Sequence, residues 1–127
     1  MNVERVSSVD ELESIRSMQS TIRKLEHGLA RMTEKGSKTT LVKKRLKASC
    51  IGLAILEKVW HQKPHEYTTE DLAEARNVLT GLLPSIANSY AKLKAGSPQR
   101  TLLERRMKAL ELAVQAIDSL SSQSWPN

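Results

Sequence analysis

Apolar residues recur at intervals of three and four along most of the chain, which is the spacing of one face of an α-helix. The first run with this spacing contains Ile15, Met18, Ile22, Leu25, Leu29 and Met32. No segment alternates apolar and polar residues as a half-buried β-strand does, and no Asn-Gly or Asp-Gly hairpin turn occurs in the sequence. The pattern therefore predicts an all-α protein.

Cap and turn residues divide this pattern into four helices. Ser8, with Glu11 three positions later, forms a capping box that starts the first helix. Gly36-Ser37 ends that helix, and the second helix follows with a similar seam. The seam of the second helix contains Val42, Leu46, Ser49, Leu53, Leu56 and Trp60.

The second half of the chain repeats this organisation. Residues 62–67 contain Pro64 and are expected to form a loop, after which Thr68 or Thr69 caps a third helix that runs to about Ala95. Ser97-Pro98 is an N-cap followed by proline at the first helical position, which starts the fourth helix. The inward residues of these two helices are expected to be Leu72, Leu79, Leu82, Ile86, Tyr90, Leu93, Leu103, Met107, Leu110, Val114 and Ile117.

Four helices of about 25 residues, joined by short loops, favour an antiparallel up-down-up-down four-helix bundle. We expect this bundle to be a single domain over residues 1–122, followed by a flexible tail over 123–127. Pro84 removes a hydrogen bond to the carbonyl of Thr80 in the third helix. A kink near residues 80–84 is therefore predicted, and assignment of that helix as two pieces is one way in which it would show.

The two halves of the chain also resemble each other. Residues 40–48, Thr-Leu-Val-Lys-Lys-Arg-Leu-Lys-Ala, match residues 101–109, Thr-Leu-Leu-Glu-Arg-Arg-Met-Lys-Ala, at an offset of 61. This match suggests that one helical hairpin occurs twice, over residues 9–63 and 69–121, packed with pseudo-twofold symmetry. The alternative is that similarly patterned helices match through composition alone.

Composition narrows the class of protein. The chain has 127 residues, no Phe and a single Cys50, so a disulfide framework is excluded and a reducing compartment is expected. The longest stretch without a charge, residues 77–91, is shorter than the roughly 20 apolar residues that a membrane-spanning helix needs. The amino terminus has no apolar signal region, so we expect a cytoplasmic protein.

Residues with catalytic or metal-binding chemistry are scarce. His61 and His65 have the spacing of two ligands on one helix, but Pro64 lies between them. No Glu-x-x-His motif of the kind found in di-iron bundles occurs. Cys50 lies beside the apolar seam and is expected to be a small buried residue. The sequence thus predicts a protein that is not an enzyme and that has no metal and no cofactor.

Charge is the most specific feature of the sequence. The formal net charge of +6 is the sum of +11 over residues 30–47 and 91–108 and −5 over the rest of the chain. In an up-down-up-down bundle these two stretches would meet at one end. Many of their cations lie in the first two turns of a helix, where the helix dipole disfavours them. An anionic partner would favour this arrangement. The candidate binding residues are Lys38, Lys43, Lys44, Arg45, Lys47, Arg100, Arg105, Arg106 and Lys108.

Several interpretations of the basic end remain open. The one we favour is a regulatory or adaptor-type interaction protein that docks an acidic protein surface. The alternative is sequence-nonspecific contact with duplex phosphates, since that needs only cations, whereas single-strand binding would need stacking aromatic residues. A solvated face kept for solubility is the simplest interpretation. Homo-oligomerisation is also open, because heptad-like seams can serve one chain or several.

One family resemblance follows from these features. The basic four-helix bundle and the Trp125-Pro126 tail resemble bacteriocin immunity proteins, which are small basic four-helix bundles with extended tails. The internal repeat departs from that family. The resemblance implies an immunity-type protein as a further alternative.

Overall fold

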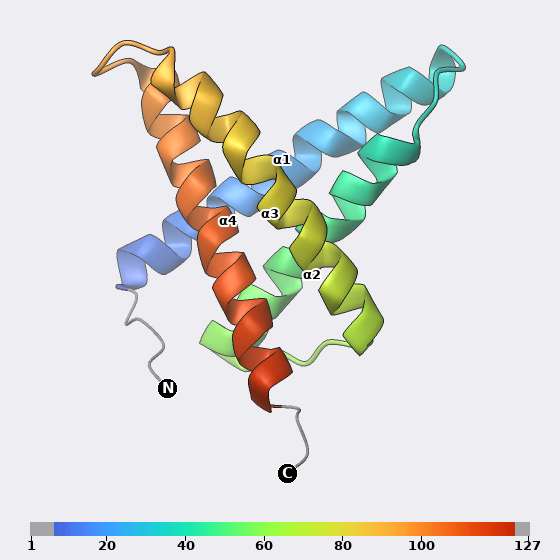
Figure 1. The fold of residues 1–127 in the computed structure, drawn as a ribbon, viewed down its shortest axis with the longest axis vertical. Coiled ribbons are helices and arrows are strands. Elements are labelled where there is room, and N and C mark those ends of the chain that lie inside the picture. Colours follow the sequence, from blue (N-terminus) through green and yellow to red (C-terminus); the bar gives the residue numbers. More distant parts are fainter. Residues whose placement is uncertain (1–6, 124–127) are drawn as a thin grey trace.

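The computed structural model describes residues 7–123, which form four α-helices (Figure 1). These are α1 (Ser8–Glu34), α2 (Thr40–His61), α3 (Thr69–Ala91) and α4 (Pro98–Gln123). The described residues contain no strand, and contacts link the helices into one bundle, which confirms the predicted all-α four-helix fold. Of the predicted tail, Gln123 is the last residue of α4 and residues 124–127 lie outside the described part of the chain.

Side-chain caps begin three of the helices. The Oγ1 of Thr68 accepts a hydrogen bond from the backbone N–H of Asp71 at 3.0 Å, and the Asp71 carboxylate accepts one from the N–H of Thr68 at 3.1 Å, which is a complete capping box. Ser97 caps α4 through the N–H of Arg100, as predicted. The cap of α1 is Ser7 and not the predicted Ser8. Both serines have an acidic residue three positions later, so the sequence alone does not distinguish them.

The ends of α1 and α3 also follow from local chemistry. Gly36, at φ +72°, ends α1 in a Schellman motif in which Ser37 N–H donates to the Met32 carbonyl at 2.9 Å. Helix α3 runs without interruption through Pro84 and ends at Ala91, so it is not divided into two pieces, and the kink near residues 80–84 stays a prediction. Pro84 is exposed, and Leu83 and Ile86 on either side pack against the core, which keeps the helix continuous.

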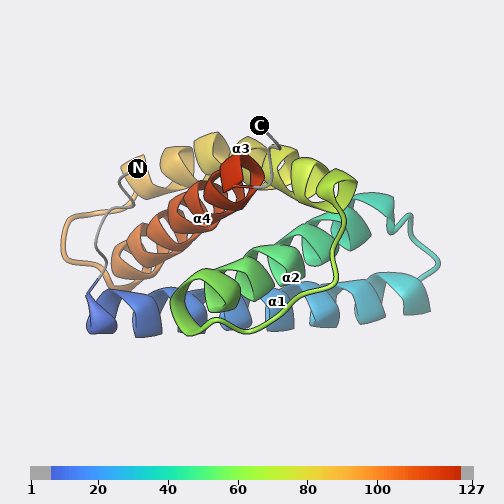
Figure 2. The same cartoon turned by 90° about the horizontal axis from the view of Figure 1, so that it is seen from below.

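The two helical hairpins cross each other (Figures 1 and 2). Helix α2 packs on α3, α4 packs on α1, and α2 and α4 touch each other, whereas the described backbones of α1 and α3 do not approach. The connection over residues 62–68 runs back along the molecule before α3 begins, as Figure 2 shows. As a result, the loop between α1 and α2 and the loop between α3 and α4 lie at separate corners (Figure 1).

The crossing point is Gly52 of α2. A Cβ atom on Gly52 would lie 3.0 Å from Cε of Met18, 3.2 Å from Cδ1 of Leu79 and 3.4 Å from Cβ of Ala113, which belong to the other three helices. The largest fully buried side chains of the structure are Met18, Ile51, Ile55, Leu56, Leu79, Leu110 and Ile117. All four helices therefore contribute to one core at this crossing.

The apolar seams are not buried along their whole length. Leu46 and Leu53, which the spacing places in the core, are only half-buried, and so are Ile22, Leu25 and Leu29 of α1. Leu25, Leu29 and Leu46 lie toward the loop between α1 and α2, where the hairpins separate (Figure 1), whereas Leu53 follows Gly52 and packs against the edge of the core. The predicted core residues Met18, Ser49, Leu56, Leu72, Leu79, Leu110 and Ile117 are buried.

The two hairpins bury the same positions. Each of the eight buried residues of the first hairpin has a buried counterpart 61 positions later. The pairs are Ser14 with Ala75, Met18 with Leu79, Ala48 with Ala109, Ser49 with Leu110, Ile51 with Leu112, Gly52 with Ala113, Ile55 with Ala116 and Leu56 with Ile117. Gly52 and Ala113, which touch at the crossing, are counterparts of each other.

Replacing Gly52 with valine should destabilise the fold. Its added methyl groups have no space between Met18, Leu79 and Ala113, and overpacking of this kind costs about 1–3 kcal/mol in the free energy of unfolding. Gly28→Val is the matched control, because a Cβ at Gly28 meets nothing within 4 Å. Urea titrations followed by circular dichroism at 222 nm measure both variants. Equal stability of the two would contradict a close crossing at Gly52.

Candidate functional site

The basic residues lie on two arms of the molecule. We call residues 30–47, with the loop between α1 and α2, the first arm, and residues 91–108, with the loop between α3 and α4, the second arm. Both views of the ribbon place these loops apart (Figures 1 and 2). The expectation that the two basic stretches meet at one end is therefore wrong, and the nine candidate residues remain candidates on two separate surfaces.

An ion pair between α2 and α3 shows how the two hairpins lie against each other. Nζ of Lys47 lies 3.4 Å from Oδ1 of Asp71. Lys47 is near the start of α2 and Asp71 is in the first turn of α3. In a parallel-sided bundle these positions would lie about 20 Å apart along the helix axes, at 1.5 Å per residue. Their contact requires α3 to start beside the first half of α2, which is the crossed arrangement.

Three candidate cations pair with carboxylates of the other hairpin. Besides the pair of Lys47 with Asp71, Lys108 lies 3.4 Å from Asp10, and Arg105 lies 3.4 Å from Glu13. The carboxylates occupy the first two turns of α1 and α3, where the helix dipole favours them. These side chains are partly or largely exposed to solvent, so each pair contributes little to stability. Part of the basic charge thus joins the two hairpins.

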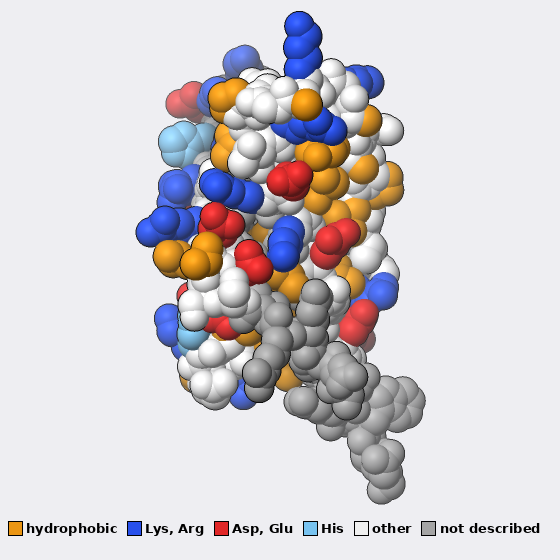
Figure 3. Space-filling model, turned by 90° about the vertical axis from the view of Figure 1, so that its left-hand side faces the viewer, with side chains coloured by type: hydrophobic (Ala, Val, Ile, Leu, Met, Phe, Trp, Pro, Cys, Tyr) orange, Lys and Arg blue, Asp and Glu red, His pale blue; other side chains and the backbone are white. Residues whose placement is uncertain are grey.

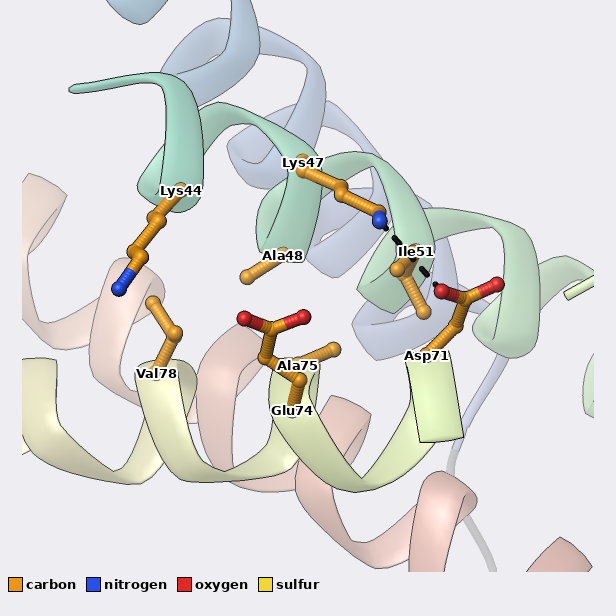
Figure 4. A pocket seen from close by; sticks show the side chains of 8 residues that line it. All are labelled: Lys44, Lys47, Ala48, Ile51, Asp71, Glu74, Ala75 and Val78. Carbon is orange, nitrogen blue, oxygen red and sulfur yellow. Dashed lines mark ion pairs between the residues drawn. The ribbon is translucent and has the colours of Figure 1, made fainter. Parts of the chain in front are cut away.

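A shallow pocket lies at the junction of α2 and α3 (Figure 4). Its walls are Lys44, Lys47, Ala48 and Ile51 of α2, and Asp71, Glu74, Ala75 and Val78 of α3. The view shows the Glu74 carboxylate between the two lysines, while the dashed line marks the ion pair of Lys47 with Asp71. Lys44 and Glu74 are the counterparts of Arg105 and Glu13, 61 positions apart. The pocket therefore belongs to the contact between the hairpins.

The remaining candidates differ between the arms. In the first arm, Lys38 and Lys43 are exposed and form no ion pair with a carboxylate of residues 7–123, and Arg45 is half-buried. In the second arm, the Arg100 guanidinium lies over the Tyr90 ring, 4.4 Å from its centre. The Tyr90 hydroxyl donates a hydrogen bond to the Glu104 carboxylate at 3.0 Å.

The second arm also carries a half-buried arginine. The Nε of Arg106 is buried and has no hydrogen-bond partner among the described residues. Figure 3 shows Lys and Arg side chains at the top of the molecule, beside a run of apolar side chains. This side of the molecule thus combines charge with apolar surface.

Two exposed leucines were not predicted from the sequence. Leu41 of α2 is 58% exposed and Leu102 of α4 is 56% exposed. Both lie off the apolar seam, one position before Val42 and Leu103, and both are followed by two cations at the positions three and four residues later. The available signal was the repeated Thr-Leu at positions 40–41 and 101–102, which stands outside the spacing of three and four.

Other chemistry is sparse in the part of the chain that the structure describes. Within residues 7–123, no group of three or more His, Cys, Asp and Glu side chains is placed to hold a metal ion. None of the described helices is long and apolar enough to cross a membrane. Cys50 is half-buried on α2, and its burial, followed by the charge of Glu26, raises the pKa of its thiol.

Comparisons with protein-family models, with curated proteins and with solved structures find no match to this chain. The resemblance to bacteriocin immunity proteins stays a prediction. The functional argument therefore rests on the arms themselves.

Acidification should weaken the contact of α2 with α3. The backbone N–H of Thr68, and next Lys47, lower the pKa of Asp71 below its ordinary value of 3.8. Because the folded pKa is lower than the unfolded one, the stability from ionised Asp71 is complete above about pH 4 and is lost as the pH falls through the folded pKa.

Asp71→Asn should therefore lower the melting temperature at pH 7 more than at pH 3. Thermal melts at both pH values measure this, with Glu70→Gln as control, since Glu70 forms neither a cap nor an ion pair with a described residue. An equal loss at the two pH values would contradict this role.

The Cys50 thiol should react slowly. A raised pKa leaves less thiolate at neutral pH, and the thiolate is the reactive form. Alkylation by iodoacetamide at pH 7.5, followed by mass spectrometry, should be at least several-fold slower in the folded protein than in urea. Glu26→Gln should speed the reaction of the folded protein, because it removes the charge that helps to raise the pKa. A folded protein that reacts as fast as the unfolded one would contradict a protected thiol.

Proposed function

We propose that this chain is a small, non-enzymatic interaction protein of the regulatory or adaptor type, which binds an acidic protein partner through its two basic arms. The observation that carries the proposal is an exposed leucine at the same position of each arm, Leu41 in the first and Leu102 in the second, each followed by cations three and four residues later. An apolar side chain within a charged rim is typical of a protein-binding surface.

Charge supports an acidic partner. The first arm contains seven cations and one acidic residue, and the second contains six cations and one acidic residue. A field of one sign steers the approach of an oppositely charged surface and excludes partners of like charge. The intramolecular ion pairs use only Lys47, Arg105 and Lys108 among the nine candidates. Lys38, Lys43 and Lys44 are exposed and lie outside these pairs, so their charge remains available to a partner.

The exposed leucines favour a protein over a nucleic acid. Contact with duplex phosphates needs cations and gains nothing from an apolar side chain beside them. Exposed Leu41 and Leu102 have a function only if the partner also offers apolar groups. Nonspecific nucleic-acid binding is therefore an outcome of the test below and not the proposal.

We also infer that the two hairpins are copies of one unit. The buried positions correspond at an offset of 61, and so do the helix caps Ser7 and Thr68. The ion pair of Lys47 with Asp71 becomes that of Lys108 with Asp10 when the hairpins are exchanged, and both measure 3.4 Å. Helices matched through composition alone have no reason to share their caps and cross-hairpin ion pairs.

Reversing the charge of Lys38 and Lys43 should weaken partner binding. Both side chains are exposed and neither pairs with a described carboxylate, so K38E/K43E should fold normally. The double variant should capture at least about tenfold less partner protein from a lysate, since tenfold corresponds to only about 1.4 kcal/mol. Quantitative mass spectrometry of the captured proteins, with nuclease added, measures the difference.

The matched control is R23E/K24E, which changes the net charge equally but lies on α1 outside both arms. This variant should capture the same proteins as the unaltered chain. Unchanged capture by K38E/K43E would overturn the proposal. Loss of all capture on nuclease treatment would assign the arms to nucleic acid.

A further inference from the structure

The two arms present the same surface twice. Along residues 41–49 and 102–110, exposed, half-buried and buried positions follow one another in the same order without exception. Leu41 and Leu102 are exposed to nearly the same degree, 58% and 56%. Three cations correspond as well: Lys44 with Arg105, Arg45 with Arg106, and Lys47 with Lys108. An element that binds one arm meets matching chemistry on the other.

The arrangement of the arms follows the exchange of the two hairpins. Gly52 and Ala113, which are counterparts, touch at the crossing, so an axis that exchanges the hairpins passes between them. This exchange puts α4 in the place of α2 and α1 in the place of α3. The contact of α2 with α3 is therefore equivalent to the contact of α4 with α1. A surface repeated about a twofold axis is complementary to two copies of one element.

The two arms diverge from the crossing (Figure 1). Their loops stand at separate corners in both views (Figures 1 and 2), and α1 and α3 do not approach. A single continuous patch would require the parallel-sided bundle that the ion pair of Lys47 with Asp71 excludes. Each arm also contains its own exposed leucine and its own cations. Each arm is therefore complete as a binding surface.

We infer that one chain binds two copies of one acidic segment with apolar side chains, one on each arm. This inference rests on the proposed function and adds the stoichiometry and symmetry of the partner. The occupant follows from complementarity: carboxylates face the cations of an arm, and an apolar side chain covers its leucine. A partner of this kind is a homodimer with one such segment in each subunit, or two separate copies of one chain.

The two sites should differ in affinity. The first arm has Lys43 where the second has Glu104, and Lys38 where the second has Gln99. Glu104 is held by the Tyr90 hydroxyl beside Arg100, which leaves a carboxylate within the second arm. An acidic segment should therefore bind the first arm more tightly, and the difference should shrink as salt screens the charges.

The test measures how many acidic peptides one chain binds. The probe is a synthetic peptide of about 18 residues, built from leucine and glutamate at helical spacing. Isothermal titration calorimetry at low salt should give two peptides per chain. Leu41→Asp and Leu102→Asp should each leave one site, and the double variant should leave none, with affinity at an altered arm reduced at least about tenfold.

These variants should fold as the unaltered chain does. Both leucines are exposed, and both lie in the first two turns of a helix, where the dipole favours a carboxylate. Leu12→Asp is the matched control, since Leu12 is 49% exposed in the first two turns of α1 and belongs to neither arm. It should keep both sites. Circular dichroism checks the helical content of every variant.

The outcomes distinguish failure of the two-site inference from failure of the proposed function. One peptide per chain, or complete loss of binding in either single variant, would overturn the two-site inference while leaving an acidic partner in place. Wild-type binding by the double variant, or no peptide binding by the unaltered chain, would overturn the proposed function as well. Binding of a random-sequence DNA duplex in place of the peptide would assign the arms to nucleic acid and overturn both.

Discussion

The close approach of four helices at Gly52 determines the shape of this protein. Because Gly52 has no side chain, Met18, Leu79 and Ala113 reach within van der Waals distance of the α2 backbone. Two hairpins that meet so closely at one point cross there, and their helices diverge on either side. The buried core is therefore concentrated at the crossing, while the apolar seams toward the loops stay half-buried. The same geometry makes two arms out of what a parallel-sided bundle would leave as one end.

The crossing also explains the charge pattern. It brings the early turns of α2 and α4, which are basic, against the first two turns of α3 and α1, which are acidic. Each partner of such a pair compensates the other across the interface, so cations near a helix start are less unfavourable than the helix dipole alone implies. This compensation accounts for Lys47, Arg105 and Lys108. It does not extend to Lys38 and Lys43, which have no such partner among the described residues. Ion pairing between the hairpins therefore does not explain the charge of Lys38 and Lys43, which makes these two residues the clearest part of the candidate site.

Local features of the fold could be predicted from the sequence, whereas the packing of the hairpins could not. The cap at Ser97 and the turn at Gly36 depend on interactions within a few residues, and the structure has them as predicted, while Thr68 is one of the two caps expected for α3. The crossing depends on how two apolar faces meet, and a seam with spacings of three and four suits parallel-sided and crossed helices equally well. The nine basic candidates were visible as a charge pattern. Leu41 and Leu102 were not, because their exposure depends on the direction in which each arm leaves the crossing.

Stability alone does not explain the surface of the arms. An exposed leucine gains nothing from folding, and a cation without a partner in an early helical turn is disfavoured. Either feature on one arm could be an accident of sequence. The exposed leucine occurs at equivalent positions of the two hairpins, Leu41 and Leu102, and the cations Arg45 and Arg106 also correspond, although neighbouring positions such as Lys43 and Glu104 differ. If the hairpins are copies of one unit, the presence of this unfavourable surface in both, while neighbouring positions differ, supports the proposal that a partner binds it.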